Sequence, residues 1–296
     1  MRRADLARLT ALAVIWSLSF VFMRVLVPVL GPIWTATLRV LIAGTALCAW
    51  FAVTRLDANV RAHWRAYLFV GALNSALPFA LFAYAARYLP ASYLVILNAS
   101  APMFAAVAAA IWLGDRLTPL KIAGLALGAA GVAMVSRAGP IVPDEHFTLG
   151  VAACLAASLC YGLAGTWLKR RGSKLRPVAV AGWSQLFAAL VLLPVAAAAP
   201  VPTAITPLIV VDMLALALVC SGVAYLLYYR LIADVGPTRA MTVTFLMPAF
   251  GMLWGVLFLD ERVTPVMVAG AAMIVAGTAT VLRIRAPVGA ASSTAR

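Results

Sequence analysis

The sequence of 296 residues is poor in charge, and above all in acidic groups. Only 11% of the residues are charged, nine are Asp or Glu, and two are His. Soluble domains carry about a quarter charged residues. This shortage excludes a soluble enzyme and a soluble nucleic-acid-binding protein. With 65% hydrophobic residues and a mean hydropathy of +1.03, the chain is expected to be solvated by the lipid bilayer.

Acidic and imidazole groups are also missing from the apolar runs. All nine acidic residues and both histidines fall in tails, in loops or at the ends of runs. A proton relay, a general base or a metal ligand in a membrane would have to lie inside a run. The sequence therefore predicts no catalytic residue, no metal site and no cofactor. It argues against an intramembrane hydrolase, a metal transporter and a pump that recognises lipophilic cations through a buried carboxylate.

Apolar runs separated by Pro, Gly or charge predict ten membrane-spanning segments. Because about 20 residues span a bilayer, ten spans leave about 96 residues for loops and tails, which excludes a soluble domain. The runs are apolar on consecutive residues, which favours helices over a β-barrel. The predicted spans are Leu9–Leu30, Ile33–Val53, Ala66–Ala86, Ala91–Leu113, Pro119–Ser136, Thr148–Leu168, Val178–Ala199, Leu208–Tyr229, Ala240–Leu259 and Pro265–Leu282.

Basic residues are distributed unequally between the two sides of these spans. With the N-terminus in the cytoplasm, 18 of the 23 Lys and Arg residues lie in cytoplasmic segments, four lie outside, and Arg39 lies inside a span. Such a bias predicts that both termini are cytoplasmic. The net charge of +14 is then explained by membrane topology, without a nucleic-acid partner.

Two segments of the chain resemble each other at a constant offset of 146 residues. Between residues 113–137 and 259–283, 12 of 25 positions are identical without a gap. Asp115-Arg-Leu-Thr-Pro119 matches Glu261-Arg-Val-Thr-Pro265. Each half then contains five spans, and an odd number places the halves in opposite orientations, as an inverted repeat.

The predicted fold is therefore an all-α integral membrane protein of ten transmembrane helices in two inverted five-helix repeats. We expect the repeats to cover residues 9–137 and 148–285, joined by an outer loop at 138–147. Residues 1–8 are expected to form a cytoplasmic tail and residues 286–296 a disordered tail. The expected partners are a small-molecule substrate and the lipid bilayer that surrounds the helices.

The duplicated motifs resemble those of the EamA family in the drug/metabolite transporter superfamily. The residues that carry this resemblance are Leu113-Gly-Asp-Arg-Leu-Thr-Pro119, Leu259-Asp-Glu-Arg-Val-Thr-Pro265, the preceding Pro102 and Pro248, and Trp16, Arg24 and Arg39. The resemblance covers about Leu9 to Arg285. It implies a central cavity, walled mainly by the first four helices of each half, and export of amino acids or related metabolites.

We therefore expect an inner-membrane transporter that exports small metabolites, with amino acids first among them, by alternating access. Because no acid lies in the spans, facilitated efflux is expected, and proton coupling through another site stays open. The alternatives are a multidrug, sugar or nucleoside carrier of the same fold and, in another class, an intramembrane enzyme or a lipid-handling scaffold. A homo-oligomer, if one forms, would use the small residues of the fifth and tenth spans.

The remaining candidates for substrate binding are rings, hydroxyls and amides. Ser75, Phe79 and Phe82 share one face of the third span, and the offset of 146 repeats this stripe in the eighth. Such stripes either line a cavity or pack between helices. Gln185 is a weaker candidate. The expected binding set of rings, amides and hydroxyls is Trp16, Phe20, Asn74, Ser75, Phe79, Phe82, Tyr161, Ser221, Tyr225 and Tyr228, in which Tyr161 matches Trp16 at an offset of 145.

Arg39 and two prolines complete the candidate site. A charge inside a span costs a few kcal/mol or more, so Arg39 either attracts a substrate carboxylate or pairs with free backbone carbonyls. Pro102 and Pro248 remove the donors to the carbonyls of Asn98 and Thr244. At each kink, the freed carbonyl and the polar side chain are either hydrogen-bonded within the protein or bind substrate. In both cases the prolines are predicted hinges.

Overall fold

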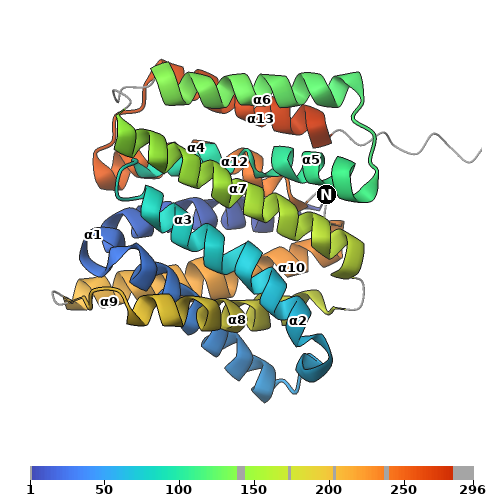
Figure 1. Ribbon diagram of the computed structural model, residues 1–296, viewed down its shortest axis with the longest axis vertical. Helices are drawn as coiled ribbons and strands as arrows, with labels where there is room; N and C mark the ends of the chain where they lie inside the picture. The colour runs from blue at the N-terminus through green and yellow to red at the C-terminus, as the bar shows by residue number, and fades with distance from the viewer. Residues whose placement is uncertain (1, 139–143, 173–174, 203–204, 237–239, 283–296) are drawn as a thin grey trace, which may run out of the picture.

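The computed structural model describes residues 2–138, 144–172, 175–202, 205–236 and 240–282, and within them every regular element is a helix (Figure 1). Eight helices in this part of the chain are long and apolar enough to cross a membrane, and one more apolar helix is shorter. The prediction of an all-helical membrane protein is therefore confirmed. The predicted disordered tail at 286–296 and residues 139–143 of the predicted loop at 138–147 lie outside the described residues.

The first helix, α1 (Arg3–Val53), contains a break. Its 51 residues would measure about 76 Å as one straight helix, against about 30 Å for the hydrocarbon core of a bilayer. At Gly31 the backbone turns to φ 75° and ψ 161°, between Pro28 and Pro32. Glycine adopts positive φ at little cost, and proline cannot continue the helical hydrogen bonds. The chain reverses here (Figure 1), between the predicted first and second spans.

The remaining helices pass back and forth between two ends of the molecule (Figure 1). The chain starts towards the right of that view, which we call the N-terminal end, and the break in α1 lies at the left, which we call the distal end. The helices after α1 are α2 (Val60–Gly71), η1 (Ala72–Ala76), α3 (Leu77–Ala85), α4 (Ala91–Asn98), α5 (Ala101–Leu113), α6 (Pro119–Ala138), α7 (Glu145–Arg171), α8 (Pro177–Ala197), α9 (Pro207–Leu214), η3 (Ala215–Val223), α10 (Ala224–Val235), α12 (Val243–Leu259) and α13 (Pro265–Leu282).

Several helices extend beyond the apolar runs. Helix α1 begins at Arg3 where the apolar run begins at Leu9, and α7 covers Glu145–Arg171 where the run covers Thr148–Leu168. Asp144 caps α7, because its carboxylate accepts a hydrogen bond of 2.7 Å from the backbone of Phe147. Hydropathy predicts the part of a helix that lies in lipid, whereas a cap of this kind decides where the helix begins.

The predicted fourth span is divided into α4 and α5 at Ala99, just before Pro102. Hydroxyl groups from other helices satisfy the carbonyls at this break. Ser158 of α7 donates to the Leu97 carbonyl at 3.3 Å, and Thr278 of α13 donates to the Ala99 carbonyl at 3.1 Å. The matched Pro248 lies inside the unbroken helix α12. The two prolines therefore have different local structures.

Helices α6 and α13 pack closely against each other (Figure 1). A Cβ atom added to Gly124 would lie 2.8 Å from the Gly277 carbonyl oxygen, and one added to Gly131 would lie 2.7 Å from that of Gly270. The two contacts are reciprocal, because 270 and 277 are 124 and 131 shifted by 146 residues. The glycines of the fifth and tenth predicted spans thus serve packing within one chain. A homo-oligomer through these helices stays a prediction and would use their other faces.

Replacing Gly277 by Ala tests this packing. The new Cβ would lie 2.5 Å from the Gly124 carbonyl oxygen and 2.7 Å from the Gly128 nitrogen, both backbone atoms. We expect a loss of about 1–3 kcal/mol in stability, seen as a lower melting temperature in detergent. Gly165→Ala is the matched control, because nothing lies within 4 Å of its added Cβ, and it should leave stability unchanged or raise it. Equal effects of the two substitutions would contradict close packing.

Candidate functional site

Aromatic rings from the two halves of the chain meet in pairs. Trp16 of α1 and Tyr228 of α10 have ring centroids 5.1 Å apart. Tyr161 of α7 stacks on Phe82 of α3 at 6.2 Å. The pairs are reciprocal, since Tyr161 matches Trp16 and Tyr228 matches Phe82 at the offsets found in the sequence. Each pair joins a ring of the first half to a ring of the second.

Two further contacts enlarge these pairs. Phe20, one turn after Trp16, packs edge-on against Phe82 with centroids 5.3 Å apart. Trp16 also lies 6.1 Å from Tyr225. The predicted rings of four helices thus form two contact groups that adjacent turns of α1 bring side by side; together we call them the aromatic cluster, defined as Trp16, Phe20, Phe82, Tyr161, Tyr225 and Tyr228. All six rings are buried or half-buried.

The predicted serines lie in two π-helical segments at matched positions. Residues 72–76 form η1, and their counterparts at an offset of 146 lie within η3. Ser75 and Ser221 are fully buried in these segments. A π-helical turn holds an additional residue, and such turns are frequent at functional sites. The residue pattern alone did not indicate them.

Arg39 is buried among neutral groups. Its side chain is 4% exposed, and its Nε donates a hydrogen bond of 2.8 Å to the Ser221 hydroxyl. The guanidinium carbon lies 3.8 Å from the ring centroid of Phe79, and Met23 sulfur accepts from a terminal nitrogen at 3.9 Å. In the described residues, none of the ion pairs involves Arg39. A buried charge without a counter-ion is costly, so this cation is available to an anion that enters the site.

An amide completes the link between the halves. The Asn74 side-chain nitrogen donates to the Tyr225 hydroxyl at 3.3 Å. Asn74 is half-buried. The face of η1 and α3 that the spacing predicted thus meets the matched face of η3 and α10.

Asn98 and Thr244 are not part of this arrangement. The Thr244 hydroxyl donates to the Met241 carbonyl of its own chain segment at 2.9 Å. Asn98 is 8% exposed at the end of α4. Among the described residues, neither makes a hydrogen bond or a ring contact with the aromatic cluster. Their helices, α4 and α12, pack against each other and against α1, and a role of these two residues in binding stays a prediction.

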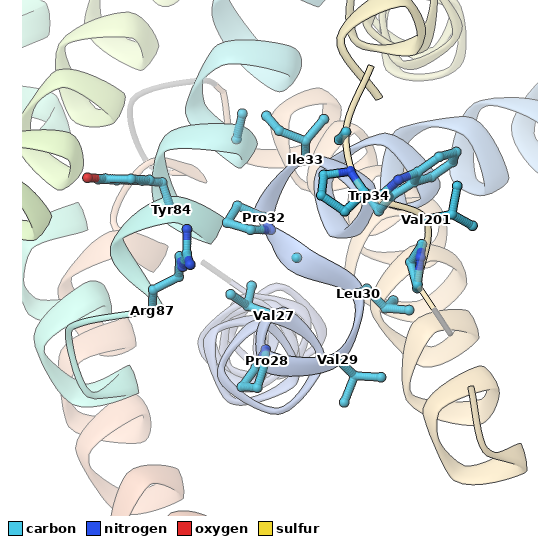
Figure 2. Close-up of a pocket in the computed structure, with 15 residues that line it drawn as sticks. Val27, Pro28, Val29, Leu30, Pro32, Ile33, Trp34, Tyr84, Arg87 and Val201 are labelled. Atoms are coloured by element: carbon cyan, nitrogen blue, oxygen red, sulfur yellow. The ribbon is translucent and has the colours of Figure 1, made fainter. Parts of the chain in front are cut away.

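A pocket of about 600 Å³ opens at the distal end, beside the break in α1. Figure 2 shows Tyr84 and Arg87 on one side of Pro32, and Trp34 with Val201 on the other. None of the predicted binding residues lines this pocket. Pro28 and Pro32 mark the break in the sequence, but they do not by themselves predict a pocket.

The pocket approaches the buried arginine along two helices. Ala80, which lines it, follows Phe79, the ring that stacks on Arg39. Trp34, also in the lining, precedes Arg39 by five residues on α1. The pocket lining is therefore close, along α1 and α3, to the residues that surround Arg39.

Residues 7–137 and 148–283 each match the model of the EamA-like transporter family. The chain belongs to the EamA-like transporter family. This confirms the resemblance carried by the duplicated motifs and, with the apolar helices, identifies a multi-pass membrane transporter.

Similar proteins support this assignment. An uncharacterized transporter of Bacillus subtilis, YvbV, is 25% identical over 283 residues, covering 90% of this chain and 88% of the relative. A probable amino-acid metabolite efflux pump of Escherichia coli is 26% identical over 294 residues, 94% of each chain. A probable terminal-alkyne amino-acid exporter of Streptantibioticus cattleyicolor is 28% identical over 195 residues, 64% of this chain and 63% of that one.

A solved crystal structure has the same fold. It superposes with a TM-score of 0.66 at 20% sequence identity, covering 95% of this chain and 96% of the other. At this identity the likeness concerns the fold alone.

Gln185 is the residue of this EamA-like chain that sequence reasoning underrated. It is fully buried in α8, and neither amide atom has a hydrogen-bond partner in the described part of the chain. A single amide forms no periodic pattern, so spacing could not reveal it. The available signal was rarity, since Gln185 is the only glutamine among the 296 residues.

Replacing Ser221 by Ala tests how far Arg39 depends on its hydroxyl partner. We expect a loss of about 1–3 kcal/mol, because a buried charged donor loses its acceptor; thermal unfolding in detergent measures it. Ser19→Ala is the control, since that hydroxyl donates to the Trp16 carbonyl within its own helix at 2.6 Å. In an Arg39→Leu background the Ser221 substitution should become nearly neutral. A loss that is unchanged in this background would refute the coupling.

Proposed function

We propose that this transporter exports amino acids with apolar or aromatic side chains across the cell inner membrane by alternating access. The observation that carries the proposal is the buried, unpaired charge of Arg39 beside an aromatic cluster from both halves of the chain. A substrate carboxylate would pair with the guanidinium, and its side chain would lie against the rings. The printed names of the Escherichia coli and Streptantibioticus cattleyicolor relatives support amino acids as the substrate class.

The proposed architecture has ten spans in two inverted repeats, over residues 9–137 and 148–285. The two arms of α1 count as two spans, and α12 as the ninth. Three observations support the repeat: the reciprocal glycine contacts of α6 and α13, the reciprocal ring pairs, and the matched π-helical segments. The bias of basic residues supports cytoplasmic termini.

Contacts at the two ends of the bundle fit the proposed alternation. At the distal end, the Glu261 carboxylate accepts hydrogen bonds from the backbone of Ala91 at 2.6 Å and of Ser92 at 3.0 Å. At the N-terminal end, Arg8 pairs with Asp234 at 2.5 Å. Each contact joins the first half of the chain to the second. We propose that they form and break in turn as the site opens to either side.

The proposed transport is facilitated and involves no catalysis. The titratable groups named in the end contacts lie at the ends of helices or in turns, and the aromatic cluster itself holds no acid. The protein would therefore release substrate down its own gradient, with the distal pocket as the beginning of the outer pathway. Under this proposal the hinge positions remain Pro102 and Pro248.

Flux into proteoliposomes tests the substrate and the role of Arg39. Radiolabelled leucine and phenylalanine should show saturable flux, whereas a sugar, a nucleoside and a cationic dye should not. Arg39→Gln should lower amino-acid flux at least about tenfold, because a charged hydrogen bond contributes about 1.5–3 kcal/mol. Arg116→Gln, at an exposed position, is the control and should leave flux unchanged.

Two results would contradict this proposal. Saturable flux of none of the amino acids would exclude amino-acid export. Acceleration of flux by a proton gradient, beyond its effect on electrical potential, would exclude facilitated efflux.

Tyr225→Phe removes the hydroxyl bound by Asn74 and should lower flux less than the arginine variant.

Replacing Glu261 by Gln tests the distal contact. The neutral amide offers one acceptor oxygen and no charge to the two backbone donors, so the start of α4 should separate more often from the turn after α12. A cysteine at Val95, which is fully buried against Gly251, reports this in a background without the native cysteines. A membrane-impermeant maleimide should label it about tenfold faster. Asp115→Asn, which removes the exposed pair with Lys169 at the other end, is the control and should not accelerate labelling.

A further inference from the structure

The amide of Gln185 is buried without a partner, although folding normally pairs such groups. It is 0% exposed, and both Nε2 and Oε1 lack hydrogen bonds within the described residues. An unpaired buried amide reduces stability, whereas an apolar side chain of similar shape would not. A native structure that keeps one requires an explanation, and a ligand that enters the site would provide the missing partners.

The position of Gln185 places it beside the aromatic cluster. Ala181, Gln185 and Ala188 share one face of α8 by their spacing. Ala181 belongs to the same buried group as Tyr225, and Ala188 to the same buried group as Phe79. Gln185 therefore lies one helical turn from residues that share buried groups with Tyr225 and with Phe79, the ring on which Arg39 stacks.

A close contact between helices supports the same location. A Cβ on Gly71 would touch the backbone of Ser184, beside Gln185 in the chain, and lie 3.0 Å from the Ala188 nitrogen. Gly71 immediately precedes η1, which holds Asn74 and Ser75. The α8 backbone is thus held directly against the segment that carries the first-half polar groups.

An amino acid has two charged groups, and Arg39 matches only the carboxylate. The ammonium group would ordinarily pair with an acid, but the aromatic cluster and its polar neighbours contain none. An amide oxygen is a neutral acceptor for ammonium, and it is buried at lower cost than a carboxylate. Asn74 is the other amide nearby; its nitrogen is held by its hydrogen bond to Tyr225 and its side chain is only half-buried, whereas Gln185 is fully buried with both amide atoms unpartnered in the described residues.

We propose that Gln185 binds the α-ammonium group of a zwitterionic amino acid whose carboxylate pairs with Arg39. This inference rests on the proposed function and deepens it, because it makes Gln185 the residue that selects for the amino group. A site built to hydrogen-bond a polar group rejects analogues that lack it. Gln185 would therefore exclude simple carboxylic acids of the same size.

Equilibrium binding to the full-length purified protein tests this selection. The ligands are L-leucine and L-phenylalanine, each paired with the acid that lacks the amino group, 4-methylpentanoate and 3-phenylpropanoate. The unmodified protein should bind each amino acid at least about tenfold more tightly than its acid. Gln185→Leu should remove most of this preference without weakening the acids, and Gln185→Glu should restore ammonium binding.

A matched variant and a second ligand separate the two ends of the substrate. Arg39→Gln should weaken 3-phenylpropanoate and leave 2-phenylethylamine, which lacks the carboxylate, unchanged. Gln185→Leu should weaken binding of 2-phenylethylamine and leave binding of 3-phenylpropanoate unchanged. Gln185→Leu should also raise the melting temperature in detergent, because it removes an unpaired buried amide. An amide with a purely structural role would lower the melting temperature when replaced.

The outcomes distinguish this inference from the proposed function. If the unmodified protein binds neither amino acid, the proposal that it exports these amino acids is contradicted. The proposed role of Gln185 is then contradicted as well. If it binds them but Gln185→Leu keeps the full preference over the acids, or weakens every ligand equally, only this inference is overturned.

Discussion

The buried guanidinium of Arg39 is the constraint on which the rest of the site depends. A membrane interior makes charge expensive, and the surrounding rings, hydroxyls and sulfur hold this cation without neutralising it. An acid beside it would form a stable internal pair and remove its attraction for an anion. The scarcity of acids in the apolar runs is thus also what would leave the arginine available to a substrate anion under the proposed function.

Under the proposed alternating access, the reciprocal contacts would let one site serve two sides of a membrane. Trp16 meets Tyr228 as Tyr161 meets Phe82, and Gly124 meets Gly277 as Gly131 meets Gly270. Contacts related in this way give two similar but unequal environments around one centre. Arg39 lies on one side only, so a substrate held by it has a defined orientation. Rings that exchange partners between halves would then allow two conformations of similar energy.

The periodic features of the site were predictable from the sequence. The spacing of Ser75 and Phe79, which is repeated in the second half, predicted which helix faces meet. This was possible because the face on which a residue lies depends only on its position along the helix. The family and the helical membrane fold followed from the duplicated motifs and apolar runs. A local rule about proline predicted Asn98 and Thr244, but it could not predict that hydroxyls of other helices bond the carbonyls of Leu97 and Ala99, or that the Thr244 hydroxyl bonds its own backbone.

Features that depend on tertiary packing lay beyond the sequence. The π-helical segments, the pocket at the break in α1 and the isolated amide of Gln185 arise from how helices meet. Gln185 is one of several buried polar groups that packing leaves without a hydrogen-bond partner, and Arg39 is a buried cation without a counter-ion among the described residues. A chain selected only for stability would replace both with apolar residues. Their retention is best explained by a zwitterion that completes both, because that ligand supplies an anion and a donor at once.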